Sequence, residues 1–558
     1  MAQATSGARY FARLLEAYGV THVFFMDAVL RRALAEMEDT PIVRVLGHSE
    51  KGVGYMADGY ARIAGRPGIC MAQSVGAANL AASMQDAWLG QSPVIAITGR
   101  HVAPMQYRNA YQEVDHGPLF QPVTKFSARI EAIEQMPLLV RQAFREATTG
   151  TPRPVHLDIA GLTGDALTPL EAPFALDVDE AHTRYPAHRP APDAAAVQKA
   201  VQLLAGSARP VIVADRGVAI SGAAQALREL GERLQAPIVT TLDAKSCIVE
   251  DDPLYAGPVG LYGRSCANHV VAEADLVIYA GSSTNDHTTA NWKMPRAGTP
   301  IIQIDLDPAE IGRNYPNTLG LQCDVRAGLL ALAGAVAAGQ RADWLARSRE
   351  HVAAWRAEVE PQLASDDAPM VPQRLCRELT RVLPANAIVV ADTGYSALWA
   401  GNLVDLRHPG QTFLRAAGSL GWSFPASLGA KAAAPDRPVV CFTGDGGFSY
   451  HLPELETARR CNLKTITVVN NNHCLSQGVR NLNIAYEGRA EGRKSDCYVY
   501  EEHDFAAIAR AFGCVGLTVD KPQDFGAAFD KALASELPVV IDVKTAFAYQ
   551  APMAWVPA

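Results

Sequence analysis

Residues 439–472 have the sequence VVCFTGDGGFSYHLPELETARRCNLKTITVVNNN, and this stretch decides the fold. An apolar run at 439–442 leads into a Gly-Asp-Gly turn, a segment with helical character follows at 451–460, and a second apolar run at 465–469 ends in three asparagines. This order predicts a strand, a helix and a second strand parallel to the first. Because parallel strands end at the same edge of a sheet, the acidic residue after the first run should lie beside the asparagines after the second.

Asp445 and Asn472 are the oxygen-bearing residues that this arrangement brings together. A carboxylate and an amide oxygen suit Mg²⁺, which takes few protein ligands and fills its coordination shell from phosphates and water. The flanking glycines Gly444, Gly446 and Gly447 let backbone N–H groups approach a phosphate, and the start of a helix adds partial positive charge. The plain alternative is an ordinary turn between a strand and a helix. We predict a clamp for a metal ion and a phosphate.

Length and composition limit the class of protein. A chain of 558 residues is expected to hold three domains. The apolar content of 49% and the charged content of 19% are typical of globular proteins. A formal net charge of −8 without a basic run argues against nucleic-acid binding. The ten cysteines form no CxxC pair, no apolar run is long enough to cross a membrane, and the N-terminus lacks the pattern of a signal peptide. We expect a cytoplasmic protein with reduced thiols and no membrane partner.

Three blocks of alternating strand and helix patterns predict an α/β protein with three doubly wound domains and mainly parallel sheets. Apolar runs of strand length occur at 23–25, 42–46, 69–72, 94–98, 155–157, 211–214, 238–240, 276–280, 301–304, 388–391, 439–442, 465–469 and 539–543. A proline-rich stretch separates the first two blocks, and a helical segment rich in charged residues separates the last two. The expected boundaries are an N-terminal domain at 1–166, a linker at 167–193, a central Rossmann-like domain at 194–342, a helical connector at 343–369 and a C-terminal domain at 370–558.

The Gly-Asp-Gly turn followed at this spacing by Asn471-Asn472 resembles the thiamin-diphosphate motif of the pyruvate decarboxylase and acetolactate synthase superfamily. A second resemblance supports it, because Glu50 stands six residues before the helix sequence MADGYAR at 56–62, as the catalytic glutamate of that superfamily does. The resemblance implies that Glu50 shares a proton with the cofactor's aminopyrimidine and so activates the thiazolium carbon. The alternative is a glutamate that merely complements a helix dipole.

Further segments carry the same resemblance. ADTGYS at 391–396 resembles a diphosphate-contacting turn, GSLGWSFP at 418–425 the segment whose bulky Leu420 bends the cofactor beneath its thiazolium ring, and SVGAANL at 74–80 a turn beside the pyrimidine. YQE at 111–113 resembles a segment whose glutamine, here Gln112, reaches toward the reacting carbons. The cofactor residues implied are Glu50, Ser74, Asn79, Thr393, Gly394, Tyr395, Ser396, Ser419, Leu420, Gly444, Asp445, Gly446, Gly447, Asn472, Cys474, Leu475 and Ser476, with Asp445, Asn472 and the backbone oxygen of Cys474 as metal ligands.

The sequence IDLDPAEIG at 304–312 resembles the central domain of acetolactate synthase-like large subunits, which makes that subgroup the nearest. Three departures concern the substrate pocket. Residues 24–29 read FFMDAV, so Met26 and Asp27 replace a small glycine-rich loop, and Asp27 either faces the substrate or caps a helix. After the metal motif, Asn481 replaces a tryptophan associated with the acceptor, and Gln477 and Arg480 are further substrate candidates. The candidate acid–base histidines are His101, His116 and His473, and a satisfied loop histidine is the alternative for each.

The third departure, GSSTNDH at 281–287, lacks the arginines of flavin-bearing members, so FAD is not expected. The resemblance implies a carboligase that uses thiamin diphosphate, Mg²⁺ and a pyruvate-like 2-oxo acid donor with a carbonyl acceptor. The alternatives are a 2-oxo acid decarboxylase, a lyase or hydrolase of a 2-hydroxyacyl thioester or cyclic diketone, and a non-catalytic cofactor-binding homologue. The resemblance also implies a homodimer as the minimal active unit, assembled into a homotetramer, with Glu50 and the metal site on different subunits. A nicotinamide enzyme is disfavoured, because no GxGxxG follows a predicted strand.

Overall fold

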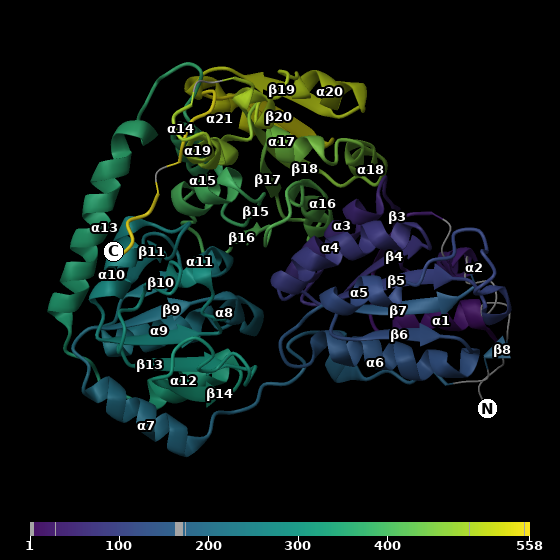
Figure 1. The fold of residues 1–558 in the computed structure, drawn as a ribbon, viewed down its shortest axis with the longest axis horizontal. Helices are drawn as coiled ribbons and strands as arrows, with labels where there is room; N and C mark the ends of the chain where they lie inside the picture. Colours follow the sequence, from purple (N-terminus) through teal and green to yellow (C-terminus); the bar gives the residue numbers. More distant parts are fainter. Residues whose placement is uncertain (1–4, 28–29, 162–170, 173–174, 490–491, 552) are drawn as a thin grey trace.

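The computed structural model describes residues 5–27, 30–161, 171–172, 175–489, 492–551 and 553–558. In these residues three six-stranded parallel sheets form the centres of three α/β units, which confirms the predicted fold class. Figure 1 shows the units around a triangle, with the N-terminal unit on one side, the C-terminal unit at the top and the central unit below it. Ala28 and Val29 of the departing FFMDAV segment, and residues 167–170 and 173–174 of the predicted linker, lie outside the described residues.

The N-terminal and C-terminal sheets share one topology. The first has the order β3-β2-β4-β5-β7-β6 and the last β16-β15-β17-β18-β20-β19, so numbering strands within each unit gives the same arrangement. The first sheet consists of β2 (His22–Phe25), β3 (Val43–Leu46), β4 (Gly68–Gln73), β5 (Val94–Arg100), β6 (Ser127–Ile130) and β7 (Val155–Ala160). The last consists of β15 (Ile388–Ala391), β16 (Thr412–Arg415), β17 (Val439–Gly444), β18 (Thr465–Asn471), β19 (Val515–Val519) and β20 (Val539–Lys544).

The central sheet has the order β11-β10-β9-β12-β13-β14, in which the strand order reverses between β9 and β12. This is the Rossmann arrangement, in which ligands bind beyond the strand ends at the reversal. Its strands are β9 (Pro210–Ala214), β10 (Ile238–Thr240), β11 (Tyr255–Pro258), β12 (Leu276–Ala280), β13 (Ile301–Asp305) and β14 (Thr318–Gln322). Within the described part of the predicted linker, β8 (Glu171–Ala172) pairs antiparallel with β1 (Thr5–Ser6) of the N-terminal unit.

Helices cover both faces of each sheet and bury its apolar strands. The longer helices of the N-terminal unit are α1 (Gly7–Ala17), α3 (Glu50–Ala64), α4 (Gly76–Leu89) and α6 (Met136–Thr148). Those of the central unit are α7 (Ala194–Ala205), α9 (Ala224–Leu234), α10 (Ser265–Glu273) and α12 (Val325–Ala335), and the connector is α13 (Ala342–Leu363). The C-terminal unit has α14 (Pro372–Val382), α15 (Tyr395–Leu403), α16 (Ser423–Ala433), α17 (Asp445–Ser449), α18 (Glu454–Arg460), α19 (Ser476–Ala485), α20 (Phe505–Ala511) and α21 (Pro522–Leu533).

The segment predicted as one helix at 451–460 is instead the end of a turn followed by α18, because Pro453 restarts the helix after α17 has ended. The parallel pairing of β17 with β18 is as predicted, with Gly444 opposite Asn470.

Helices α3 and α16 join the N-terminal and C-terminal units, as Figure 1 shows. Two glycines allow their backbones to touch. A Cβ atom on Gly59 would lie 2.1 Å from the backbone oxygen of Ala426, and one on Gly429 would lie 1.8 Å from that of Met56. Because a side chain at either position would collide with backbone, glycine sets how closely the two units approach. Among the described residues, no helix is both long and apolar enough to cross a membrane.

Candidate functional site

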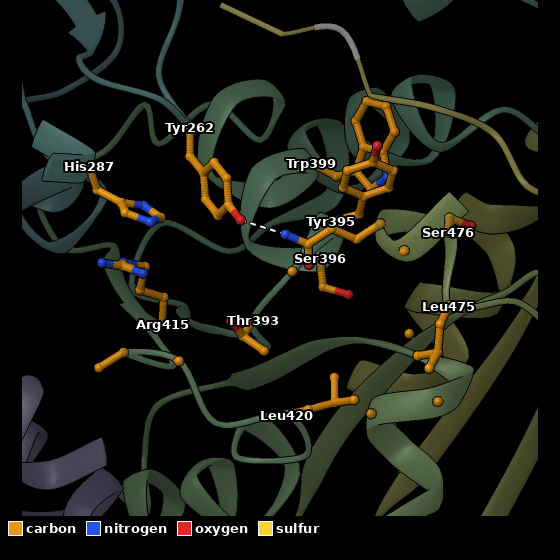
Figure 2. Close-up of a pocket in the computed structure, with 18 of the residues that line it drawn as sticks. Tyr262, His287, Thr393, Tyr395, Ser396, Trp399, Arg415, Leu420, Leu475 and Ser476 are labelled. Carbon is orange, nitrogen blue, oxygen red and sulfur yellow. Dashed lines mark hydrogen bonds between the residues drawn. The ribbon is translucent and has the colours of Figure 1, made fainter. Parts of the chain in front are cut away.

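A cavity of about 800 Å³ opens where the carboxyl ends of the C-terminal strands face the central unit (Figure 2). Asp445 and Asn472 both line it, directly after the neighbouring strands β17 and β18. The predicted residues that line the cavity are Thr393, Gly394, Tyr395, Ser396, Leu420, Gly444, Asp445, Gly446, Gly447, Asn472, Cys474, Leu475, Ser476, Gln477 and Asn481. The structure therefore brings together segments that are far apart in the sequence.

Asp445 and Asn472 are buried, and their polar atoms are held in fixed positions. The carboxylate of Asp445 accepts hydrogen bonds from the backbone N–H of Gly446 at 2.7 Å and of Cys474 at 3.1 Å. Burial raises the pKa of Asp445 to about 6, because removal from water disfavours the charged carboxylate more than its backbone hydrogen bonds stabilise it. The Nδ2 of Asn472 donates to Ser476 Oγ at 2.8 Å, which fixes the amide and leaves Oδ1 as a possible ligand.

Two helices begin at the cavity without a side-chain cap. Helix α15 follows Gly394, and α19 follows Leu475, and neither preceding residue accepts a hydrogen bond through its side chain. Backbone N–H groups at such uncapped helix starts can bind an anion. Gly394 has a φ of +67°, and a Cβ there would lie 2.7 Å from Gln477 Oε1. This turn therefore requires glycine. The backbone N–H donors of the groove match the acceptor oxygens of a diphosphate.

The donor set fits a divalent cation with a diphosphate. A buried carboxylate, a fixed amide and uncapped helix starts at one strand edge supply hard oxygen ligands for Mg²⁺ and N–H donors for phosphate oxygens. Leu420 projects into the same cavity in Figure 2, below Thr393. Its place between the groove and the N-terminal unit suits contact with an apolar ring. Ser419 does not line the cavity and instead contacts Tyr55 through its side chain.

Glu50 lies in the N-terminal unit and is not among the residues that line this cavity. It is the first residue of α3, after Ser49, whose Oγ caps the helix by accepting from Gly52 N at 3.0 Å. Asn79 Nδ2 donates to Glu50 Oε2 at 3.2 Å. A Cβ on Gly76 would lie 2.5 Å from Glu50 Oε1, so glycine makes room for this carboxyl. Glu50 and Asn79 lie side by side at a surface half-open to solvent.

Ser74 and Gln112 lie beside that surface. The Ser74 hydroxyl donates to the backbone oxygen of Gln112, and Gln73 Nε2 donates to Gln112 Oε1 at 2.7 Å. His116 is fully buried beneath Ser74, where its Nδ1 lies 2.9 Å from Asp158 Oδ1. His101 is also buried, with Nε2 against the backbone oxygen of Tyr111. The interior positions of both histidines do not suit direct contact with a substrate.

The remaining substrate candidates do not lie together, and only some of them line the cavity. Asp27 is exposed and pairs with Arg31 at 3.2 Å, so it neither caps α2 (Arg31–Glu36) nor faces the cavity, and Met26 is half-buried beside it. Arg480 is exposed on α19 and does not line the cavity, whereas its neighbours Gln477 and Asn481 do.

The central unit contributes residues that sequence reasoning missed. Tyr262 accepts a hydrogen bond from Gln477 Nε2 across the cavity, and its ring lies 4.8 Å from that of His287 (Figure 2). Asp243 of the central unit also lines the cavity and pairs at 2.6 Å with Arg415, the last residue of β16 in the C-terminal unit. The one sequence signal for Asp243 and His287 was their place after predicted strands of the central sheet, and Tyr262 follows β11, which no apolar run predicted.

Comparisons with known proteins agree with this geometry. The family models described as thiamine pyrophosphate enzyme N-terminal TPP binding domain, central domain and C-terminal TPP binding domain match residues 5–119, 197–332 and 392–543. The chain belongs to the thiamine pyrophosphate enzyme family, whose members include carboligases and decarboxylases.

Three curated relatives indicate which subgroup of the family the chain resembles. The chain is 33% identical to a Methanocaldococcus jannaschii protein named "Probable acetolactate synthase large subunit", over 96% of this chain and 91% of the relative. It is 31% identical to the acetolactate synthase isozyme 2 large subunit of Escherichia coli, over 96% and 95%. A Pseudomonas aeruginosa protein named "Probable 2-ketoarginine decarboxylase" is 33% identical over 92% and 88%. Within its family the chain is therefore acetolactate synthase-like.

Proposed function

We propose that this chain is a thiamin-diphosphate- and Mg²⁺-dependent carboligase, which releases CO₂ from a pyruvate-like 2-oxo acid and joins the remaining acyl unit to a carbonyl acceptor. One observation carries the proposal: Asp445 and Asn472 end neighbouring parallel strands in a groove that also receives two uncapped helix starts. That combination is the donor set for a metal-bridged diphosphate.

Each residue has a separate task in this proposal. Asp445, Asn472 and the backbone oxygen of Cys474 would hold the cation, and the turns at Thr393–Ser396 and Gly444–Gly447 would hold the diphosphate. Bound thiamin diphosphate supplies a thiazolium ring that stabilises negative charge on the substrate's carbonyl carbon. Glu50 holds a proton at its carboxyl, with Oε2 oriented by Asn79.

The size of the cavity supports a second substrate. The space continues from the groove past Leu420 to Tyr262 and His287 of the central unit. A simple decarboxylase needs only a proton there, whereas a carboligase needs room and polar contacts for an acceptor. Gln477, Asn481, Tyr262 and His287 are the polar residues placed to orient it.

Simple decarboxylation of a 2-oxo acid is the second candidate. The observation that favours it is Asn481, a small polar residue in the cavity where the resemblance expects the tryptophan associated with the acceptor. The relative named as a 2-ketoarginine decarboxylase shows that the family holds such proteins at comparable identity.

We also propose that the active unit is a homodimer in which Glu50 of one chain serves the groove of the other. Glu50 does not line the cavity of its own chain, and the surface around it exposes large apolar side chains. Val75, which precedes Gly76, and Tyr111, which precedes Gln112, belong to this exposed set, and a partner subunit would bury them.

The test is to incubate the protein with thiamin diphosphate, Mg²⁺ and a panel of 2-oxo acids, with and without added carbonyl acceptors, while following CO₂ and organic products. CO₂ release with a ligated 2-hydroxy ketone or 2-hydroxy-3-oxo acid product is the expected result. CO₂ release with only the aldehyde would assign the decarboxylase. Absence of CO₂ from every acid would overturn both and move the assignment to a lyase or hydrolase.

A further inference from the structure

The segment 416–423, which carries Leu420, runs between the N-terminal and C-terminal units and is met by a buried carboxylate on each side. We propose that Asp86 and Asp392 are positioning residues that clamp this segment and so set where Leu420 stands in the cavity. This inference rests on the proposed function, since it concerns the contact of Leu420 with bound thiamin diphosphate.

Asp86 holds the first half of the segment. It lies on α4 of the N-terminal unit and is 1% exposed. Its Oδ1 accepts from Ala417 N at 2.9 Å, and its Oδ2 accepts from Gly418 N at 3.1 Å and from Ser419 N at 2.8 Å. Successive backbone N–H groups that converge on one carboxylate form an anion nest, here filled by a side chain from another unit of the same chain.

Asp392 holds the second half. It follows β15 and is fully buried. Its Oδ1 accepts from Gly421 N at 3.0 Å, and its Oδ2 accepts from Ser423 N at 3.0 Å and from Ser423 Oγ at 2.6 Å. The same Oδ1 also accepts from Thr393 N at 3.0 Å, which ties the segment to the turn at the cavity floor. Leu420 is therefore the residue between two anchored halves.

A buried cation lies beside the first carboxylate. Arg62 Nη2 lies 3.4 Å from Asp86 and 2.7 Å from Asp58, and its Nη1 donates to the backbone oxygen of Arg415 at 2.9 Å. The guanidinium also lies 4.6 Å from the ring centre of Trp422, whose Nε1 donates to Asp58 Oδ2 at 2.8 Å. Burial raises the pKa of Asp86, and the charge of Arg62 opposes that rise.

Asp86 acts on the position of the segment and not on the metal groove, whereas Asp392 also holds Thr393 of the diphosphate turn. Neither Asp86 nor Asp392 lines the cavity, and neither contacts Asp445 or Asn472. An asparagine at position 86 would turn an NH₂ group toward backbone N–H donors, because one of its two oxygen positions becomes a donor. The segment would then shift, and Leu420 with it, while the diphosphate site stays intact.

The test uses full-length holoenzyme in D₂O with thiamin diphosphate and Mg²⁺ but no substrate, and measures deuterium exchange at the thiazolium C2 together with the cofactor's dissociation constant. Asp86→Asn should slow exchange at least about tenfold and change the dissociation constant less than about threefold. Leu420→Ala should slow exchange in the same way. The variant that combines Asp86→Asn with Leu420→Ala should exchange no more slowly than the slower of the two single variants, because both substitutions act through the contact of Leu420 with the cofactor. The matched control is Asp324→Asn, which removes a buried carboxylate that caps α12 in the central unit.

Ser423→Ala provides a milder variant that keeps both carboxylates and removes the hydroxyl bond to Asp392 together with a weak bond from Cys441 Sγ at 3.4 Å, and it should slow exchange by a smaller factor. Unchanged exchange in Asp86→Asn and Ser423→Ala, or multiplicative effects of Asp86→Asn and Leu420→Ala, would overturn the inference. Because exchange needs no substrate, a wild-type protein that exchanges C2 but converts no 2-oxo acid would defeat the proposed reaction and leave the clamp standing.

Discussion

At the scale of single residues, the placement of the Glu50 carboxyl depends on the absence of a side chain at Gly76. Gly76 opens the second helix of the proposed pyrimidine site, and a Cβ there would lie 2.5 Å from Glu50 Oε1 and 2.8 Å from its Cγ. The obstructed atoms belong to the end of a flexible side chain, so the carboxyl can move away at little cost in folding energy. A methyl group at this position would therefore test placement apart from stability.

We expect Gly76→Ala to lower turnover and C2 exchange at least about tenfold, while the free energy of unfolding changes by less than about 1 kcal/mol. Denaturant titration and the exchange assay measure the two quantities. The control is Gly334→Ala, an exposed helical glycine of α12 whose Cβ would meet nothing within 4 Å. It should stabilise the protein by about 1 kcal/mol and leave turnover unchanged. Full activity in Gly76→Ala would remove Glu50 from the site.

At the scale of elements, the end of β13 carries a buried acid with a measurable effect. Asp305 is 8% exposed, and burial raises its pKa to about 7. An aspartate in an unfolded chain titrates near pH 4, so the folded protein binds an extra proton between about pH 4 and 7. The free energy of unfolding must then fall as pH rises through that window, by up to about 1.4 kcal/mol per unit.

Asp305→Asn should therefore flatten the pH dependence of the unfolding free energy between about pH 5 and 7 and raise stability at pH 8. Urea titrations at a series of pH values measure this, with the exposed Asp520→Asn of the C-terminal unit as control. An unchanged slope in Asp305→Asn would show that Asp305 is ionised in the folded protein across the window.

The elements also show how far sequence reasoning reached. Thirteen apolar runs correspond to observed strands of the three six-stranded sheets, and the strands of these sheets without such a run are β6, β11, β14, β16 and β19. All five stand at the edges of their sheets, and of the edge strands only β3 has such a run. An interior parallel strand is buried on both faces and reads as a continuous apolar run, whereas an edge strand such as β14, TLGLQ, is partly open to solvent and mixes polar residues and glycine. The apolar runs therefore predict every interior strand of these sheets and miss five of their six edges.

The cavity shows the same limit. The groove around Asp445 and Asn472 could be predicted because its residues follow strands at a recognisable spacing. Tyr262 and His287 could not, since they reach the cavity only through the way the central unit packs on the C-terminal unit. The clamping role of Asp86 and Asp392 could not be predicted either, because the partners of these carboxylates are mainly backbone groups, which leave no pattern in a sequence.

At the scale of the whole molecule, the proposed active site is divided between two chains. The groove belongs to the C-terminal unit, and Glu50 lies at a separate surface of the N-terminal unit. A twofold dimer would bring each Glu50 to the other chain's groove and make two equivalent sites. The two halves can then be inactivated separately, by Glu50→Gln and by Asp445→Asn.

The most direct measurement is complementation between these two variants. Each homodimer should be inactive with thiamin diphosphate and Mg²⁺, because both of its sites lack one half. Unfolding the variants together and refolding an equal mixture should restore about a quarter of wild-type activity, since half of the dimers are mixed and one of their two sites is intact. The control is each variant refolded alone. A mixture as inactive as its parents, while the refolded wild-type protein is active, would contradict the shared site.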